Sequence, residues 1–134
     1  MKLSTRSRYG TRMMLDLAQN YDKGPVPIRD IAKRQDISVK YLEQLIIPLK
    51  KAKLIKSVRG PKGGHMLSKA PHEINVGDLI QVLEGEVEFI HCVSNPNTCD
   101  KREECLTRGI WEEASKAMVE KLNATTLSDV ISRG

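Results

Sequence analysis

Apolar residues recur at helical spacing in two neighbouring segments between residues 28 and 51. They are Ile28, Ile31 and Ala32 in the first segment, and Val39, Leu42, Leu45, Ile46 and Leu49 in the second. The intervening residues 35–37 are too few to form anything longer than a tight turn. The pattern therefore predicts a short helix, a turn and a longer helix, which is the arrangement of a helix-turn-helix.

Two short apolar runs follow this motif and predict a β-hairpin. Residues 54–58 and 65–68 flank the glycine-rich sequence RGPKGG, in which the glycines permit a tight reversal. Arg59 and Lys62 would project from the tip, as expected of a wing that enters a DNA minor groove. A phosphate-binding nucleotide loop is excluded, because that loop needs Gly-Lys-Ser/Thr before a helix.

The remaining pattern places helices on both sides of the motif. A first helix is expected over residues 5–20, with Tyr9, Met13, Met14 and Leu17 buried. Three more segments are expected to be helical: residues 76–85 after an Asn75 cap, a long helix over about 102–123, and a short turn capped by Thr126. The predicted fold class is mainly α with a small β-hairpin wing. We expect a winged helix-turn-helix domain at 1–74, then a second region at 75–134 that contains a loop and the long helix.

The two halves of the chain carry net charges of opposite sign. Residues 1–69 contain 16 Lys and Arg against 5 Asp and Glu, a net +11, whereas residues 70–134 contain 6 against 12, a net −6. A basic half is typical of a protein that binds a polyanion. The first half is therefore predicted to bind double-stranded DNA.

The start of the second motif helix supplies the candidate base-reading residues. Ser38 is a suitable N-cap, and in a helix-turn-helix this end of the second helix meets the major groove. Lysine can pair with guanine or phosphate, glutamine with adenine, and glutamate with a cytosine amino group. Pro48 should kink this helix or shift its local hydrogen bonding near Gln44. The predicted DNA-binding residues are Lys40, Tyr41, Glu43 and Gln44 of the helix, and Arg59, Gly60, Pro61 and Lys62 of the wing.

Three cysteines lie within fourteen residues of the acidic half, at Cys92, Cys99 and Cys105. An odd number in a chain without a leader sequence argues against a disulfide framework. Metal or cluster binding, a redox switch and incidental thiols all remain open from the cysteines alone. The candidate metal ligands are these three residues.

The long helix at 102–123 carries more apolar surface than the chain is expected to cover. Its stripe consists of Leu106, Ile110, Ala114, Met118 and Leu122, widened by Trp111 and Ala117. A symmetric homodimer would cover this face and match a palindromic operator. The predicted dimerisation residues are Ile110, Trp111, Ala114 and Met118, and packing within one chain is the alternative.

Other classes of protein fit the sequence less well. No apolar run approaches the roughly 20 residues of a membrane span, and the N-terminus lacks the apolar segment of a signal peptide. A cytoplasmic protein with no membrane partner is therefore expected. An enzyme or iron-sulfur carrier with an incidental helix-turn-helix stays open as an alternative. However, the basic half shows no catalytic Ser/His/Asp or paired-carboxylate spacing, so no catalytic residues are predicted.

Three sequence features together resemble a known family. The segments ISVKYLEQLI and SVRGPKGGH, with three cysteines leading into CLT-x-x-x-W, resemble the IscR type of bacterial winged-helix transcription regulators, the Rrf-two family. The resemblance covers essentially the whole chain. It implies a homodimeric repressor or activator that carries a 2Fe-2S cluster and adjusts iron-sulfur assembly genes, so that region 75–134 would comprise a cluster-binding loop and a dimerisation helix. An assembly scaffold would act as the cluster donor. It also implies DNA contacts by Glu43, Gln44 and residues 59–61. At position 40 the family's best-matched members often have a small polar residue, and this chain has a lysine.

The resemblance also shows one departure at the cluster site. IscR-like proteins use a histidine three residues beyond the third cysteine, and that position is Arg108 here. A guanidinium offers only donors and cannot bind iron. A fourth ligand would come from Asp100, Glu103, Glu104, His91 or the other protomer. The alternative is a regulator of sulfur or cysteine metabolism, or of oxidative stress, whose cysteines form a thiol switch or a zinc site.

Overall fold

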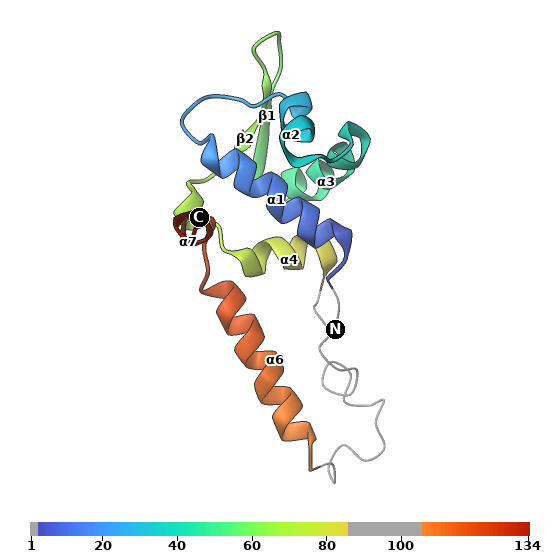
Figure 1. Ribbon diagram of the computed structural model, residues 1–134, viewed down its shortest axis with the longest axis vertical. Coiled ribbons are helices and arrows are strands. Elements are labelled where there is room, and N and C mark those ends of the chain that lie inside the picture. Colours follow the sequence, from blue (N-terminus) through green and yellow to red (C-terminus); the bar gives the residue numbers. More distant parts are fainter. Residues whose placement is uncertain (1–2, 86–105) are drawn as a thin grey trace.

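The computed structural model describes residues 3–85 and 106–134 and consists of helices with one two-stranded sheet (Figure 1). The elements are α1 (Thr5–Gln19), α2 (Ile28–Gln35), α3 (Val39–Lys51), β1 (Ile55–Val58), β2 (Gly64–Leu67), a 3₁₀ turn η1 (Pro71–Glu73), α4 (Val76–Glu84), α6 (Arg108–Asn123) and α7 (Leu127–Ser132). The predicted fold class, mainly helical with a hairpin wing, is confirmed.

The helix-turn-helix forms where the apolar spacing predicts it. At the end of α2, Asp36 adopts a left-handed conformation with φ 53° and turns the chain. The Ser38 hydroxyl then accepts a hydrogen bond from the Tyr41 backbone N–H at 3.1 Å, which confirms Ser38 as the N-cap of α3. α3 continues as a helix through Pro48 to Lys51. It buries the four apolar residues Leu42, Leu45, Ile46 and Leu49.

The hairpin is joined to the body at its base. β1 and β2 are antiparallel, and the pair Ile55 and Leu67 at the base is buried. The backbones of Val26 and His65 exchange two hydrogen bonds of 2.8 Å, which attaches the loop before α2 to the outer edge of β2. The base is therefore fixed, while the tip at residues 59–63 projects from the body (Figure 1).

One hydrophobic core joins the motif to the segments that follow it. The core contains residues of α1, α2, α3 and both strands, and also Ile74, Leu79, Leu83 and Leu127. It thus crosses residue 74, where the sequence analysis divides the chain. Gly10 allows α1 to approach α4 closely, since a Cβ there would lie 2.4 Å from a Leu83 methyl carbon. The starts of α4 and α7 are held together by backbone hydrogen bonds of 2.8 and 2.9 Å.

The long C-terminal helix begins later than predicted. α6 starts at Arg108, and Leu106 and Thr107 form a turn before it, so the expected start at residue 102 is wrong. Residues 102–105 lie outside the described part of the chain. The charged run before Leu106 has good helix propensity, but propensity alone does not fix a helix boundary. α6 ends at Asn123, as predicted.

α6 extends away from the rest of the molecule (Figure 1). No residue of this helix is buried, and its contact with the body is made chiefly near its C-terminal end against α4. At this junction Gly77 lets the start of α4 lie close to the end of α6, since a Cβ there would overlap the Asn123 side chain. Over residues 3–85 and 106–134, no helix combines the length and the apolar character needed to cross a bilayer.

Candidate nucleic-acid interface

The predicted DNA-binding residues lie on the outer surface of α3 and at the tip of the wing. Lys40, Glu43 and Gln44 are exposed on α3. Residues 59–62 are all exposed at the hairpin tip, where Gly60 has φ 111° and so needs a glycine. Their exposure leaves these side chains available to bases and phosphates, and the contacts themselves remain predictions.

Tyr41 differs from the other predicted contacts on α3. Its ring is only partly exposed and packs edge-on against Tyr9 of α1, with ring centroids 5.9 Å apart and an interplanar angle of 83°. Its hydroxyl shares a 2.9 Å hydrogen bond with the Thr5 hydroxyl. α1 therefore provides contacts for both the ring and the hydroxyl of Tyr41, and a DNA contact by Tyr41 stays a prediction.

Positive charge continues from α3 to the wing tip. The exposed basic residues from the start of α3 to the wing tip are Lys40, Lys50, Lys51, Lys53, Lys56, Arg59 and Lys62. None of them forms an ion pair with another described residue. Phosphate groups can therefore bind these cations without first displacing a carboxylate of the described chain.

His65 lies in β2 of the wing, paired with Ser57 of β1. Burial and the charge of Lys50 lower the pKa of His65, and the carboxylate of Glu43 partly opposes that effect. Its Nδ1 shares a 2.9 Å hydrogen bond with the Ser57 hydroxyl across the hairpin. The side chain of His65 therefore joins the two strands of the wing.

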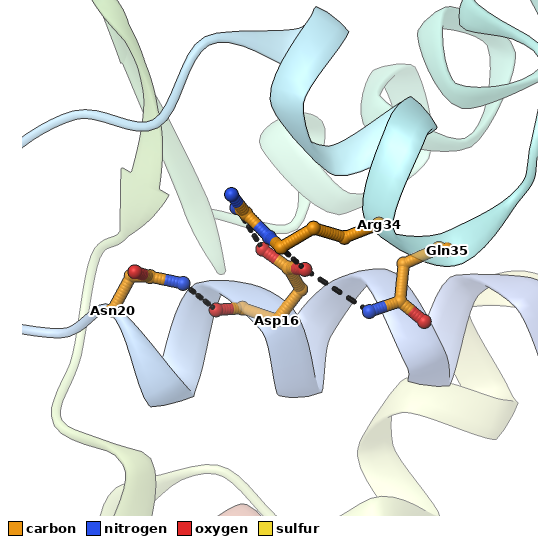
Figure 2. A network of polar contacts seen from close by, with 4 residues as sticks. All are labelled: Asp16, Asn20, Arg34 and Gln35. Carbon is orange, nitrogen blue, oxygen red and sulfur yellow. Dashed lines mark hydrogen bonds and ion pairs between the residues drawn. The ribbon is translucent and has the colours of Figure 1, made fainter.

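A buried carboxylate, which the sequence analysis did not single out, holds the helix-turn-helix against α1 (Figure 2). Asp16 is only 2% exposed and accepts hydrogen bonds from Arg34 Nε and Nη2 at 2.9 and 2.7 Å. Gln35 donates a third hydrogen bond to the same carboxylate at 3.0 Å. A signal was present in the sequence, since Asp16 interrupts the apolar run MMLDLA, and a buried charge requires a partner.

These contacts keep Asp16 ionised. Burial alone would raise the pKa of Asp16, but the hydrogen bonds from Arg34 and Gln35 and the positive charge of Arg34 outweigh it. The pKa of Asp16 therefore lies below its ordinary value, and the same pairing raises the pKa of Arg34. The last two residues of α2 are thus fixed to α1 by a charged, directional contact.

The predicted metal ligands Cys92, Cys99 and Cys105 lie outside the described residues. Within the described ranges, no group of three or more His, Cys, Asp or Glu side chains is placed to hold a metal ion. Arg108, which occupies the position of the resembling family's histidine, is the first residue of α6 and pairs with Glu112 at 2.6 Å. Its side chain therefore stabilises the first turn of the helix.

The predicted dimerisation residues lie along α6. Ile110 is 58% exposed, and Trp111, Ala114 and Met118 are partly exposed. Leu106, in the turn before the helix, is 96% exposed. This helix therefore presents apolar side chains that the described part of its own chain does not cover.

Known proteins match the chain over almost its full length. The Rrf2 family, described as "Iron-dependent Transcriptional regulator", matches residues 3–133. The chain belongs to the Rrf2 family of transcriptional regulators. This membership accounts for the winged helix-turn-helix and supports DNA binding by that domain.

Individual Rrf2 relatives carry different names. Protein rrf2 of Nitratidesulfovibrio vulgaris strain Hildenborough is 50% identical over 131 residues, covering 98% of this chain and 87% of the relative. The solved structure of T. potens IscR is 42% identical, with a TM-score of 0.80 over 99% of this chain and 88% of that one. The structure of CymR, "the Global Cysteine Regulator of B. subtilis", is 36% identical, with a TM-score of 0.87 over 100% of this chain and 98% of that one.

Proposed function

We propose that this Rrf2 protein is a homodimeric repressor that binds a palindromic operator and responds to iron-sulfur supply through a 2Fe-2S cluster on Cys92, Cys99 and Cys105. Its targets would be genes of iron-sulfur cluster assembly. The observation that carries the proposal is the group of three cysteines ending three residues before α6, in a chain whose family is described as iron-dependent.

The residues of this chain fit three of the four ligands of such a cluster. Thiolates are the usual ligands of iron-sulfur clusters, and the three cysteines supply them. Arg108 offers only donors and is engaged with Glu112, so the fourth ligand comes from elsewhere. Asp100, Glu103, Glu104 and His91 of the same chain, and the residues of a second protomer, are the candidates. When bound, the cluster would make the protein sensitive to iron, sulfide and oxidants.

The position of the cysteines connects them to dimer geometry. The segment that contains them joins the end of α4 at Glu84 to the start of α6 at Arg108. α6 would pair with its counterpart through Ile110, Trp111, Ala114 and Met118. A change at Cys105 therefore acts next to the first turn of the dimer helix. The separation of two recognition helices depends on that dimer, which would couple the cysteines to operator choice.

A second candidate function is favoured by one comparison. The structural match to the cysteine regulator CymR has a TM-score of 0.87 over the whole chain. In this alternative the cysteines form a thiol switch or a zinc site, and the target genes belong to sulfur or cysteine metabolism or to the response to oxidative stress. The DNA-binding surface of α3 and the wing would be the same in both cases.

The deciding experiment examines protein purified without oxygen. Visible absorbance together with about two iron and two sulfide per protomer supports the cluster, whereas a colourless protein with zinc or free thiols supports the second candidate. Cluster-loaded and cluster-free protein are then compared at one salt concentration for affinity and sequence preference, using duplexes enriched from a random pool. Equal affinity and equal preference of the two forms would refute the coupling.

An Arg108→His variant serves as the control for the fourth ligand. If position 108 lies outside the native site, the variant should keep the spectroscopic ligand signature of the parent protein. A signature that changes to one with an added histidine would instead show that position 108 faces the cluster. The iron content of both proteins provides the matched measurement.

A further inference from the structure

Four side chains of α1 face the helix-turn-helix along one side of that helix. Thr5, Tyr9, Arg12 and Asp16, here named the α1 stripe, follow one another at intervals of four, three and four residues. Residues at this spacing share one face of a helix. Each of the four contacts α2, α3 or another member of the stripe, so the stripe forms a continuous polar and aromatic contact surface.

The first half of the α1 stripe holds the start of α3. Thr5 shares its 2.9 Å hydrogen bond with the Tyr41 hydroxyl, and the ring of Tyr9 packs edge-on against the ring of Tyr41. The guanidinium of Arg12 lies over the Tyr9 ring, 5.4 Å from its centroid. Tyr41 belongs to the first turn of α3, one residue after the exposed Lys40 and two residues before the exposed Glu43.

The second half of the α1 stripe holds the end of α2. Asp16 accepts hydrogen bonds from Arg34 and Gln35, as Figure 2 shows. Arg12 donates to the Gln35 side-chain oxygen at 3.3 Å and also to the Gln35 backbone oxygen. Gln35 is the last residue of α2 and is followed by the turn. The stripe therefore contacts the elements on both sides of the turn.

We propose that the α1 stripe sets the orientation in which α3 meets DNA, and that Tyr41 contributes to operator recognition as a positioning residue held by Thr5 and Tyr9 rather than as a base-reading one. This inference rests on the operator-specific binding proposed above. The apolar core beneath these helices is non-directional, so it favours their burial without fixing their rotation closely. Hydrogen bonds and edge-on ring contacts depend strongly on geometry and can fix that rotation.

A double-mutant cycle separates positioning from direct readout at Tyr41. The variants are Thr5→Val, Tyr41→Phe and the combination of both, which remove the two hydroxyls and keep the side-chain shapes. Affinity is measured for a duplex that the wild-type protein enriches from a random pool, and for a scrambled duplex of equal length. We expect each single variant to lose about threefold to tenfold on the enriched duplex, and the double variant to lose little more than either.

Direct readout predicts a different pattern for the same variants. If the Tyr41 hydroxyl contacts DNA itself, Tyr41→Phe should weaken binding while Thr5→Val leaves it unchanged, and the two effects should add. That result would overturn the proposal. A wild-type protein that enriches no duplex at all would refute the operator specificity on which the proposal rests, and this outcome is distinct from failure of the cycle.

The other half of the α1 stripe is tested with Asp16→Asn, which keeps the shape and removes the charge. We expect at least tenfold weaker binding to the enriched duplex and less than a twofold change on the scrambled duplex, because the phosphate-binding cations stay in place. Asp129→Asn in α7 is the control, since the exposed Asp129 carboxylate accepts a hydrogen bond from the Thr126 backbone N–H in a capping box away from the helix-turn-helix. Equal selectivity loss in both variants, or equal loss on both duplexes, would contradict a positioning role.

Discussion

The body of the protein and helix α6 differ in how they use apolar residues. In the body, comprising residues 3–85 and 124–134, side chains such as Met13, Met14 and Leu42 are completely buried in one core. Along α6 no side chain is buried, and Ile110 is 58% exposed although its stripe is as regular as those of the body helices. The same sequence pattern therefore has two different outcomes within one chain.

This difference indicates where each region obtains its stability. Burial of apolar area stabilises the body within one protomer. The apolar side chains of α6 bury little area against their own chain. Most of their contribution to stability would therefore come from a second copy that covers them. Variants in the two regions should consequently change different measured quantities: the free energy of unfolding for the body, and the dimer equilibrium for α6.

The largest effect is expected from a cavity in the body. Met14→Ala removes a fully buried side chain from the core and should lower the free energy of unfolding by about 2–5 kcal/mol. Denaturant unfolding followed by circular dichroism at one fixed protomer concentration measures the change. Met118→Ala on α6 is the matched control. An equally large loss in the control at protomer concentrations that favour the monomer would contradict the comparison.

The next effect is expected from a charge on the exposed stripe of α6. Ile110→Asp should weaken the proposed dimer by about 100-fold or more, because an unpaired carboxylate would be buried at the interface. Light scattering across a range of concentrations gives the dimer equilibrium, and circular dichroism checks that the body remains folded. Lys116→Gln, on the opposite face of α6 and in an exposed 4.0 Å ion pair with Glu120, should leave the dimer unchanged. A dimer that survives Ile110→Asp would place the interface elsewhere.

The smallest effect is the pH dependence of the stability that Asp16 gives to the body. The folded-state pKa of Asp16 lies below its ordinary value, so the ionised carboxylate stabilises the fold above the unfolded-state pKa of about 3.9. This contribution should be lost as the pH falls through the lower, folded-state pKa. The difference in unfolding free energy between wild type and Asp16→Asn should therefore shrink on acidification below about pH 4. A difference that stays constant from pH 7 to pH 3 would show that the charge of Asp16 is not involved.

Local signals in the sequence were sufficient for most of the fold. Apolar spacing located the helices of the motif, and the caps Ser38, Asn75 and Thr126 all accept the backbone hydrogen bonds expected of them. The glycines of RGPKGG located the hairpin tip. These features depend on residues within a few positions of one another, and the interactions that decide them are present in the local sequence.

Tertiary structure decided what each side chain of the candidate site contacts. The pairing of Tyr41 with Thr5 joins residues 36 positions apart, and that of Asp16 with Arg34 joins residues 18 apart. Periodicity assigns residues to a helix face, but it does not say which distant element covers that face. For this reason the sequence by itself determined the helix-turn-helix, the wing and the exposed residues Lys40, Glu43 and Gln44. Only the packing of α1 against α2 and α3 decided that the ring and the hydroxyl of Tyr41 contact α1. The uncovered face of α6, by contrast, was expected from its apolar stripe.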